Sequence, residues 1–132
     1  ANSRARIDEA EVVIAPRTGP EILAGSTRLK SGTAAKLVLN ALTTAAMIRL
    51  HKVYDNWMVD LKPTNRKLVF RAVRVIADLG RVTPARAESL FAASGRHVKT
   101  AVVMARLGVS RPAGRRRLAA VGGSLRLALS EA

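Results

Sequence analysis

The chain has 132 residues, enough for one domain with a hydrophobic core, and 48% of them are apolar but only 3% aromatic. Cys is absent, which excludes disulfides and thiolate metal sites. No run approaches the roughly 18 consecutive apolar residues of a membrane span, and the N-terminus lacks the apolar core of a secretory signal, so we expect a soluble, cytoplasmic protein.

The net charge of +14 is concentrated in the second half of the chain. Residues 1–61 hold 8 Lys and Arg against 6 Asp and Glu, whereas residues 62–132 hold 15 against 3. A field of this sign attracts polyanions, so a nucleic-acid partner must be considered. Because aromatic residues that would stack on bases are scarce, we favour the simpler interpretation that Arg occupies solvated helix positions.

The first predicted elements are a strand and a long helix. Residues 11–16 form a β-branched run stopped by Pro, which is typical of a buried strand in a parallel sheet. After a loop at 17–25, a helix is predicted from Ser26 or Thr27 to about Leu50. Its polar positions recur at steps of three and four residues: Thr33, Lys36, Asn40 and Thr44. They form one narrow stripe, so we expect the helix to be central and buried. The first residue is Ala rather than Met, and we expect the chain to begin inside a larger fold.

The remainder is predicted to be mostly helical. Residues 51–60 contain turn residues and a short extended segment. Residues 63–65 open a second helix that continues to about Leu79 and is ended by Gly80. Its predicted buried face contains Leu68, Val69, Ala72, Val73, Ile76 and Leu79.

A cluster of short helices follows a plausible boundary at residues 80–83. Thr83-Pro84 should cap and open the first of them, which Gly95 closes, and the next runs from Val98 to Leu107 before Gly108. Two more are predicted, from Ser110 to about Val121 and, after a glycine pair at 122–123, from Leu125 to Leu129.

The segment at residues 19–33 carries the strongest chemical signal. It lies between a predicted strand end and a helix start, where open α/β sheets place their ligands and where free backbone N–H groups favour an anion. Ser26 and Thr27 add hydroxyl donors, while Arg28 and Lys30 add positive charge. A phosphate-bearing or hydroxyl-rich ligand fits these groups, although an ordinary helix cap followed by two solvated cations explains them equally well.

Residues 19–40 resemble a signature shared by the N-acetylmuramic acid 6-phosphate etherases and the glucokinase regulatory proteins. They read Gly-Pro-Glu-Ile-Leu-Ala-Gly-Ser-Thr-Arg-Leu-Lys-Ser-Gly-Thr-Ala-Ala-Lys-Leu-Val-Leu-Asn. Similarity to the etherases continues at residues 52–54, 58–60, 64–65 and 98–101, and so covers essentially the whole chain.

This resemblance implies an α/β protein with the sugar isomerase fold, a flavodoxin-like parallel sheet flanked by helices, followed by a small helical domain. Residues 1–80 would then be the C-terminal part of the sugar isomerase domain and residues 81–132 the helical domain, so that this chain itself is mostly α-helical. The resemblance also implies a homodimer whose small-molecule partner is a phosphosugar.

The resemblance implies a reaction as well. The etherases cleave the lactyl ether of N-acetylmuramic acid 6-phosphate, giving N-acetylglucosamine 6-phosphate and D-lactate in cell-wall sugar recycling. Elimination across C2 and C3 of the sugar needs a base for the C2 proton and an acid for the departing lactate oxygen. The etherases use glutamates earlier in the fold for this work, so we expect no catalytic residue here and no activity from this chain alone.

The substrate-binding residues expected in this chain are Glu21, Gly25, Ser26, Thr27, Arg28 and Lys30. In related aminosugar isomerase domains a similar Glu and Ser-Thr pair occur at the same separation, with the Ser-containing turn against the sugar. Glu21 has two interpretations, as part of the pocket wall or as an anchor of the loop.

We expect no cofactor, and a metal site is not indicated because His51 and His97 lack the spacing of metal ligands. His51 and Trp57 replace smaller residues expected in the etherases, and His51 is interpreted as a partner of a helix C-terminus. His97 is interpreted as neutral surface. Asp55 and Asp60 are interpreted as turn residues.

Two rival functions remain open. Residues 83–108 have the outline of a helix-turn-helix, with Arg96, Lys99 and Arg106 on or near its second helix, which would make a nucleic-acid-binding module. The other rival is a non-catalytic phosphosugar-binding regulator, although the chain is short for the two tandem sugar domains of the glucokinase regulatory protein.

Overall fold

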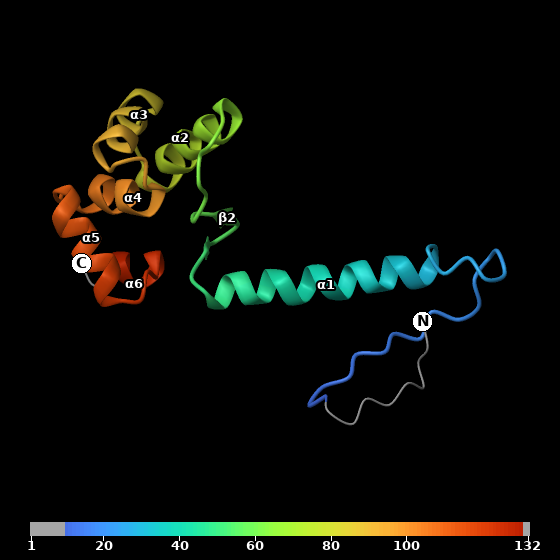
Figure 1. Cartoon of the computed structure of the whole chain (residues 1–132). Helices are drawn as coiled ribbons and strands as arrows, with labels where there is room; N and C mark the ends of the chain where they lie inside the picture. The colour runs from blue at the N-terminus through green and yellow to red at the C-terminus, as the bar shows by residue number, and fades with distance from the viewer. Residues whose placement is uncertain (1–9, 131–132) are drawn as a thin grey trace. The chain divides into compact units, whose positions relative to one another are not determined.

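The computed structural model describes residues 10–130, which are mostly helical, as expected for this chain (Figure 1). The elements in chain order are α1 (Lys30–Arg49), β1 (Val53–Tyr54), β2 (Trp57–Met58), α2 (Arg66–Gly80), α3 (Pro84–Ala93), α4 (Val98–Leu107), α5 (Arg111–Ala120) and α6 (Leu125–Ser130). Internal contacts divide the chain into two compact units, one up to Ala46 and one from Met47 onward. The predicted division at residues 80 and 81 concerns a larger protein and stays a prediction.

The predicted strand at residues 11–16 is wrong for this chain. The segment is irregular, and Val12, Val13 and Ile14 are exposed. A β-strand needs a neighbouring strand to satisfy its backbone N–H and C=O groups, and no described residue supplies one. The sequence pattern is that of a buried strand, but residues 10–130 contain no strand that pairs with it.

The long helix is confirmed, whereas its predicted burial is wrong. Helix α1 begins at Lys30, four residues after the predicted start at Ser26, and ends at Arg49. Ser31 is its one buried residue, and Leu37, Leu39 and Leu42 are exposed. None of the helices in residues 10–130 has the length and apolarity that crossing a membrane requires.

After the last turn of α1, the second unit contains a two-stranded hairpin, which confirms the short extended segment predicted at residues 51–60. Strands β1 and β2 are antiparallel, with Val53 opposite Met58 and Tyr54 opposite Trp57. Asp55 turns the chain with a φ of 49°, a left-handed conformation that Asp tolerates better than most residues. Val59, directly after the hairpin, is fully buried in the core.

Helix α2 presents the predicted face to the core. Asn65 caps it, because its Oδ1 accepts a hydrogen bond from the Leu68 N–H at 2.9 Å. Ala72 and Ile76 are buried as expected, and Val75 is buried as well. Gly80 is the last helical residue rather than the stop, since the left-handed turn falls on Arg81, with a φ of 55°.

Helices α3 to α6 lie close to their predicted bounds and are held by local caps. The Thr83 hydroxyl accepts from the Arg86 N–H at 3.3 Å, and Gly108 ends α4 with a φ of 65°. Ser110 opens α5 without a side-chain hydrogen bond. Helix α4 is the central one and packs against α2, α3, α5 and α6. Its residues 98–103 are all buried, so the core of the second unit is built around it.

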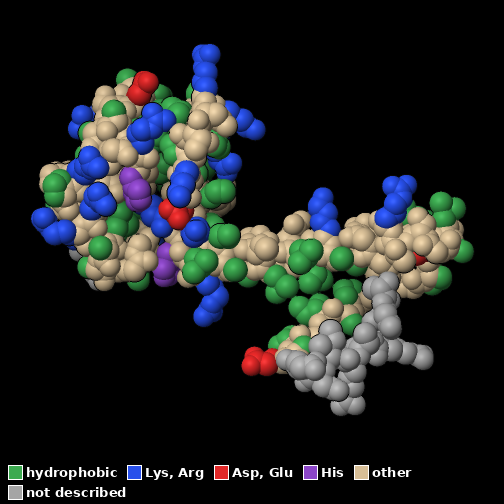
Figure 2. Space-filling view, in the orientation of Figure 1, with side chains coloured by type: hydrophobic (Ala, Val, Ile, Leu, Met, Phe, Trp, Pro, Cys, Tyr) green, Lys and Arg blue, Asp and Glu red, His purple; other side chains and the backbone are tan. Residues whose placement is uncertain are grey.

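The exposed surface of the second unit is strongly cationic. Lys and Arg side chains are spread over the face seen in Figure 2, whereas Asp and Glu are few. Within the described residues the ion pairs join Lys52 to Asp60 at 3.6 Å and Arg126 to Asp55 at 2.8 Å. Most of the cations therefore face solvent, as the sequence indicates for Arg on helix surfaces.

Candidate functional site

Glu21 ties the loop that precedes α1 to the first turn of the helix. Its Oε2 accepts a hydrogen bond from the backbone N–H of Lys30 at 2.9 Å, and its Oε1 accepts one from the backbone N–H of Ser31 at 3.0 Å. Hydrogen bonds from the Ser31 N–H, which has the larger effect, and from the Lys30 N–H hold the pKa of the Glu21 carboxyl below its ordinary value of 4.5. Of its two interpretations, the structure therefore supports the loop anchor.

Further contacts close the same loop. The Lys30 ammonium donates to the carbonyl of Pro20 at 2.9 Å, and the hydroxyls of Thr18 and Ser31 are 3.4 Å apart. Gly25 adopts a φ of 80°, a conformation that a side chain would strain, and the Ser26 N–H donates to the Leu23 carbonyl at 3.0 Å. The chain between Thr18 and Ser31 is thus folded back on itself.

These contacts correct the expected mode of anion binding. The first two N–H groups of α1 are taken by Glu21, and the next two, of Gly32 and Thr33, donate to the carbonyls of Thr27 and Leu29 at 2.8 and 3.1 Å. The helix start therefore has no free backbone donor to offer a phosphate. The Glu21 carboxylate occupies the positive end of the helix dipole, where an anion is stabilised.

The side chains available to a ligand in this loop are those of Ser26, Thr27 and Arg28. None of the three makes a hydrogen bond within the described part of the chain, and Thr27 and Arg28 are exposed. The structure thus brings all six sequence-predicted residues into one loop, but in different roles. Glu21, Gly25 and Lys30 shape it, while Ser26, Thr27 and Arg28 remain free to bind. Their contact with a substrate stays a prediction.

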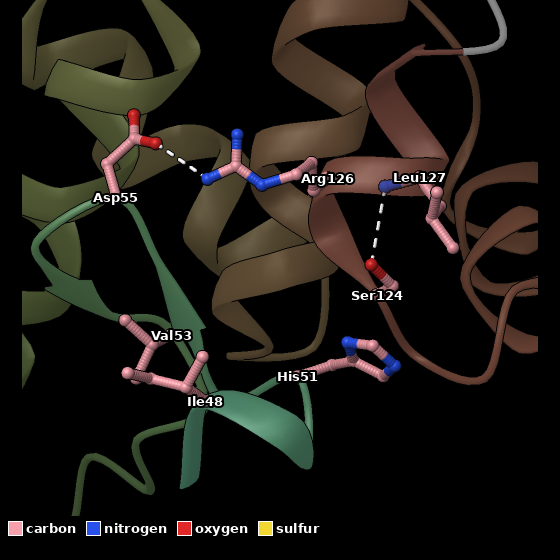
Figure 3. Close-up of a pocket in the computed structure, with 7 residues that line it drawn as sticks. All are labelled: Ile48, His51, Val53, Asp55, Ser124, Arg126 and Leu127. Atoms are coloured by element: carbon pink, nitrogen blue, oxygen red, sulfur yellow. Dashed lines mark hydrogen bonds and ion pairs between the residues drawn. The ribbon is translucent and has the colours of Figure 1, made fainter. Parts of the chain in front are cut away.

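A pocket of about 410 Å³ lies in the second unit, between the hairpin and α6 (Figure 3). It is lined by Ile48, His51, Val53, Asp55, Ser124, Arg126 and Leu127. The Arg126 guanidinium donates to the Asp55 carboxylate at 2.8 Å and lies over the Tyr54 ring at 5.0 Å. The Ser124 hydroxyl accepts from the Leu127 N–H at 3.3 Å.

Sequence reasoning missed this pocket because its members are far apart in the chain. Asp55 and Arg126 are separated by 71 positions, and no motif joins them. The structure shows Asp55 at the hairpin turn, as predicted, but also paired with the last helix. The sequence interpretation of His51 as a partner of a helix C-terminus stays a prediction; the residue follows α1 in a left-handed conformation, with a φ of 56°. Its exposed ring faces the pocket.

A second group of titratable side chains surrounds the start of α4. The Nδ1 atom of His97 lies 3.4 Å from the backbone nitrogen of Thr100, which donates to it, and 2.9 Å from the Thr100 hydroxyl. Burial lowers the pKa of His97, Asp60 opposes that change, and the cations Lys99, Arg115 and Arg111 add to it. The direction agrees with the predicted neutral imidazole, and the residue is exposed as predicted, but its Nδ1 atom also caps α4.

Lys99 is the buried cation of this group, with 7% of its surface exposed. Its ammonium donates to the Gly123 carbonyl at 3.0 Å. Burial lowers the pKa of Lys99, Asp60 raises it, and Lys52 lowers it further. Within residues 10–130, no three His, Asp or Glu side chains gather closely enough to hold a metal ion.

The chain is similar to part of several longer curated proteins. It is 52% identical over 124 residues to a protein from Gloeothece citriformis, 49% over 120 residues to one from Mycolicibacterium smegmatis, and 50% over 121 residues to one from Salmonella paratyphi B. These alignments cover 94%, 91% and 92% of this chain but 40%, 40% and 41% of the relatives.

All three relatives are named N-acetylmuramic acid 6-phosphate etherase, which confirms the resemblance found at residues 19–40. The chain spans about two-fifths of the length of these proteins and corresponds to their C-terminal portion. No protein-family model matches the chain.

Proposed function

We propose that this chain acts as the C-terminal part of an N-acetylmuramic acid 6-phosphate etherase and contributes to binding the sugar phosphate. The observation that carries the proposal is the identity of about 50% with proteins of that name over more than nine-tenths of this chain. The loop at residues 18–31 adds to it, because its hydrogen bonds hold Ser26, Thr27 and Arg28 together at the start of α1.

In the proposed reaction, this chain binds the substrate and another part of the enzyme transfers the protons. A base removes the C2 proton of the sugar, the C3–O bond breaks with its electron pair passing to the lactate oxygen, and an acid protonates that oxygen. Water then adds across the new double bond. We assign the base and acid to the portion of the etherases that precedes the matched region, so this chain supplies contacts to the substrate and no proton transfer.

Within this chain, Arg28 is the residue proposed to face an anionic group of the substrate. An exposed guanidinium without a hydrogen bond to a described residue can donate two parallel hydrogen bonds to a phosphate or carboxylate. The hydroxyls of Ser26 and Thr27 suit sugar hydroxyls, which both donate and accept. Cell-wall sugar recycling in the cytoplasm and a homodimeric assembly are part of the same proposal.

The helix-turn-helix alternative is disfavoured by the position of α4. A recognition helix must offer one face to a DNA groove, whereas residues 98–103 of α4 are buried and the Lys99 ammonium is bonded to the Gly123 carbonyl in the turn before α6. The surface charge of the second unit remains compatible with weak, salt-sensitive attraction to polyanions. No specific base contact follows from it.

A chimera tests the proposal. The portion of the Gloeothece citriformis relative that precedes the matched region is joined to this chain, and D-lactate release from N-acetylmuramic acid 6-phosphate is measured. We expect turnover by the chimera and none by the chain alone. Turnover by the chain alone would show that its own residues carry the proton transfers, and an inactive but folded chimera would remove the etherase assignment.

Kinetics of variants in the chimera test the loop. Arg28→Ala and Ser26→Ala should raise KM, roughly tenfold for Arg28, with a smaller change in kcat, because binding contacts common to ground and transition states are lost. Lys36→Ala, on the polar stripe of α1, is the matched loss of a cation outside the loop and should leave both constants unchanged. If Arg28→Ala behaves like Lys36→Ala, the loop does not contact the substrate.

A further inference from the structure

The solvent-facing side of α2 combines four cations with an exposed aromatic ring. Helices α3 and α4 pack against the other side of α2 (Figure 1). At 3.6 residues per turn, the exposed positions of residues 66–74 fall within roughly 140° of the helix. This arc, which we call the cationic face of α2, consists of Arg66, Lys67, Phe70, Arg71 and Arg74. Phe70 is 73% exposed and lies between Arg66 and Arg74, four residues from each.

The charges of the cationic face do not stabilise the helix that carries them. Arg66 and Lys67 stand in its first turn, where the helix dipole disfavours cations. Lys67 and Arg71 are four residues apart, the spacing at which like charges repel each other on a helix. Asp78 is the acidic residue of α2, and the ion pairs of residues 10–130 include neither it nor these cations. An anionic partner would therefore offset a repulsion that the fold leaves uncompensated.

The exposed ring narrows the choice of that partner. Each of the other three aromatic rings, those of Tyr54, Trp57 and Phe91, is covered by a guanidinium at 5.0 to 5.7 Å. Phe70 is thus the one ring free to stack, whereas proteins that hold single-stranded nucleic acid offer a groove with successive rings. An acidic protein surface would need a pocket that receives the ring. The partner that fits best is anionic at its surface and apolar just beneath it.

We propose that the cationic face of α2 binds reversibly to a membrane surface that contains anionic phospholipids. Such a surface presents phosphate groups to the guanidinium and ammonium groups, and acyl carbons lie just beneath them, where the Phe70 ring inserts. Because the headgroups adapt to the convex side of a helix, neither a pocket nor a groove is needed. The association is peripheral and does not involve the loop at residues 18–31, so it is independent of the proposed function.

The charge of the whole second unit supports this association. Residues 47–130 hold 17 Lys and Arg against four Asp and Glu, so an anionic surface attracts the unit before contact. Each Lys or Arg close to such a surface strengthens binding about fivefold. The four cations of α2 then contribute a factor of roughly 600, and insertion of the Phe70 ring contributes about tenfold more.

Sedimentation with vesicles tests the proposal. The 132-residue chain is mixed with vesicles of phosphatidylcholine containing about 30% phosphatidylglycerol, and with vesicles of phosphatidylcholine alone. We expect binding to the anionic vesicles only. It should weaken at least about tenfold when salt is raised from roughly 0.1 to 0.5 M, because exposed charges are then screened. Lys67→Gln/Arg71→Gln should bind about 25-fold more weakly and Phe70→Ala about tenfold more weakly.

Matched substitutions separate the cationic face from the net charge. Arg115→Gln/Arg116→Gln removes two exposed cations from α5, which packs against α4 and α6. Leu127→Ala shortens an apolar side chain of α6 that is 48% exposed. Both controls should bind within about threefold of the wild type. All the substituted positions are exposed, so each variant should unfold at the wild-type urea concentration or above it.

Fluorescence reports whether position 70 enters the lipid. Trp57 is the single Trp of the chain, so Trp57→Phe/Phe70→Trp moves the fluorophore to the cationic face. Its emission should shift to shorter wavelength on anionic vesicles and should be quenched by lipids brominated in their acyl chains. The wild-type chain, in which Trp57 is half-buried beneath Arg74, should show little quenching.

Four results would overturn the proposal. The first is a lack of binding to anionic vesicles at about 0.1 M salt, and the second is equal binding to both kinds of vesicle. The third is an equal loss for the α2 and α5 double variants, or a fluorophore at position 70 that brominated lipids do not quench. The fourth uses a thymidine oligonucleotide of about 20 nucleotides: if Phe70→Ala weakens binding to it but not to vesicles, the partner is single-stranded nucleic acid.

Discussion

Gly80 at the end of α2 lies directly against Ala105 of α4. A Cβ atom added at Gly80 would stand 2.8 Å from the Cβ of Ala105, closer than such atoms approach each other in proteins. Neither atom can rotate away, because both are fixed to their helix backbones. The close approach of α2 and α4 at this point therefore depends on the lack of a side chain at Gly80.

Gly80→Ala should destabilise the second unit by about 1–3 kcal/mol, because the helices must separate to admit the methyl group. Urea unfolding followed by circular dichroism measures this change. Gly114→Ala in α5 is the matched control, since its added Cβ would meet Val103 at an ordinary 3.5 Å. That substitution should be neutral or stabilising through helix propensity. Equal effects of the two substitutions would contradict the close approach.

The amides of Lys30 and Ser31 should report the titration of Glu21. Because the folded pKa of Glu21 is depressed, its contribution is complete above the ordinary pKa of 4.5 and is lost as the pH falls through the lower, folded value. We expect the proton chemical shifts of both amides to change together with an apparent pKa below 4.5. Glu21→Gln should abolish that titration, and the amide of Ala41, in the middle of α1, should not show it. Titration at or above 4.5 would contradict the cap.

His97 should make the second unit less stable in mild acid. Its folded pKa is lowered, so the unfolded chain takes up the proton first, and stability falls as the pH drops below the ordinary value of 6.5. Protonation also removes the Nδ1 acceptor used by Thr100. Thermal unfolding between pH 7.5 and 5.5 measures the slope, and His97→Asn should reduce it while keeping a capping side chain. A wild-type midpoint that is constant over this range would rule out the effect.

Lys99 should tolerate loss of its charge better than loss of its length. Its side chain is largely buried, and burial already disfavours the charged ammonium. We expect Lys99→Met to unfold within about 1 kcal/mol of the wild type. Lys99→Ala should lose about 2 kcal/mol or more, because it leaves a cavity. Urea unfolding of the two variants distinguishes these cases, and equal losses would assign the main contribution to the hydrogen bond with Gly123.

Local sequence signals predicted most of the second unit. Thr83-Pro84 and Gly108 mark helix ends through backbone chemistry that acts within one turn, so α3 and α4 could be placed almost to the residue. The same reasoning was wrong for Gly80, which is the last residue of α2 and not the residue that stops the helix. Its role is the close approach to Ala105, 25 positions later, and no local rule reports such a distance.

The first unit shows the other limit of local reasoning. The sequence patterns of residues 11–16 and of α1 both indicate burial. Within the described residues, however, both segments are mostly exposed. The motif at residues 19–40 identified the family and the loop. It could not tell which groups of that loop are already engaged, because the bonds from Glu21 to Lys30 and Ser31 depend on how the loop folds back.

The carboxylate at the start of α1 also determines how a ligand meets this loop. The Glu21 carboxylate competes with a free phosphate for the N–H groups of Lys30 and Ser31. Because Glu21 belongs to the same chain, its effective concentration at these groups is higher than that of a phosphate in solution. The loop is therefore preorganised, and the entropy of ordering it is lost on folding rather than on binding. Under the proposed function, discrimination between sugars would come from the side chains that the loop displays, and Glu21 would act on binding only through the shape of the loop.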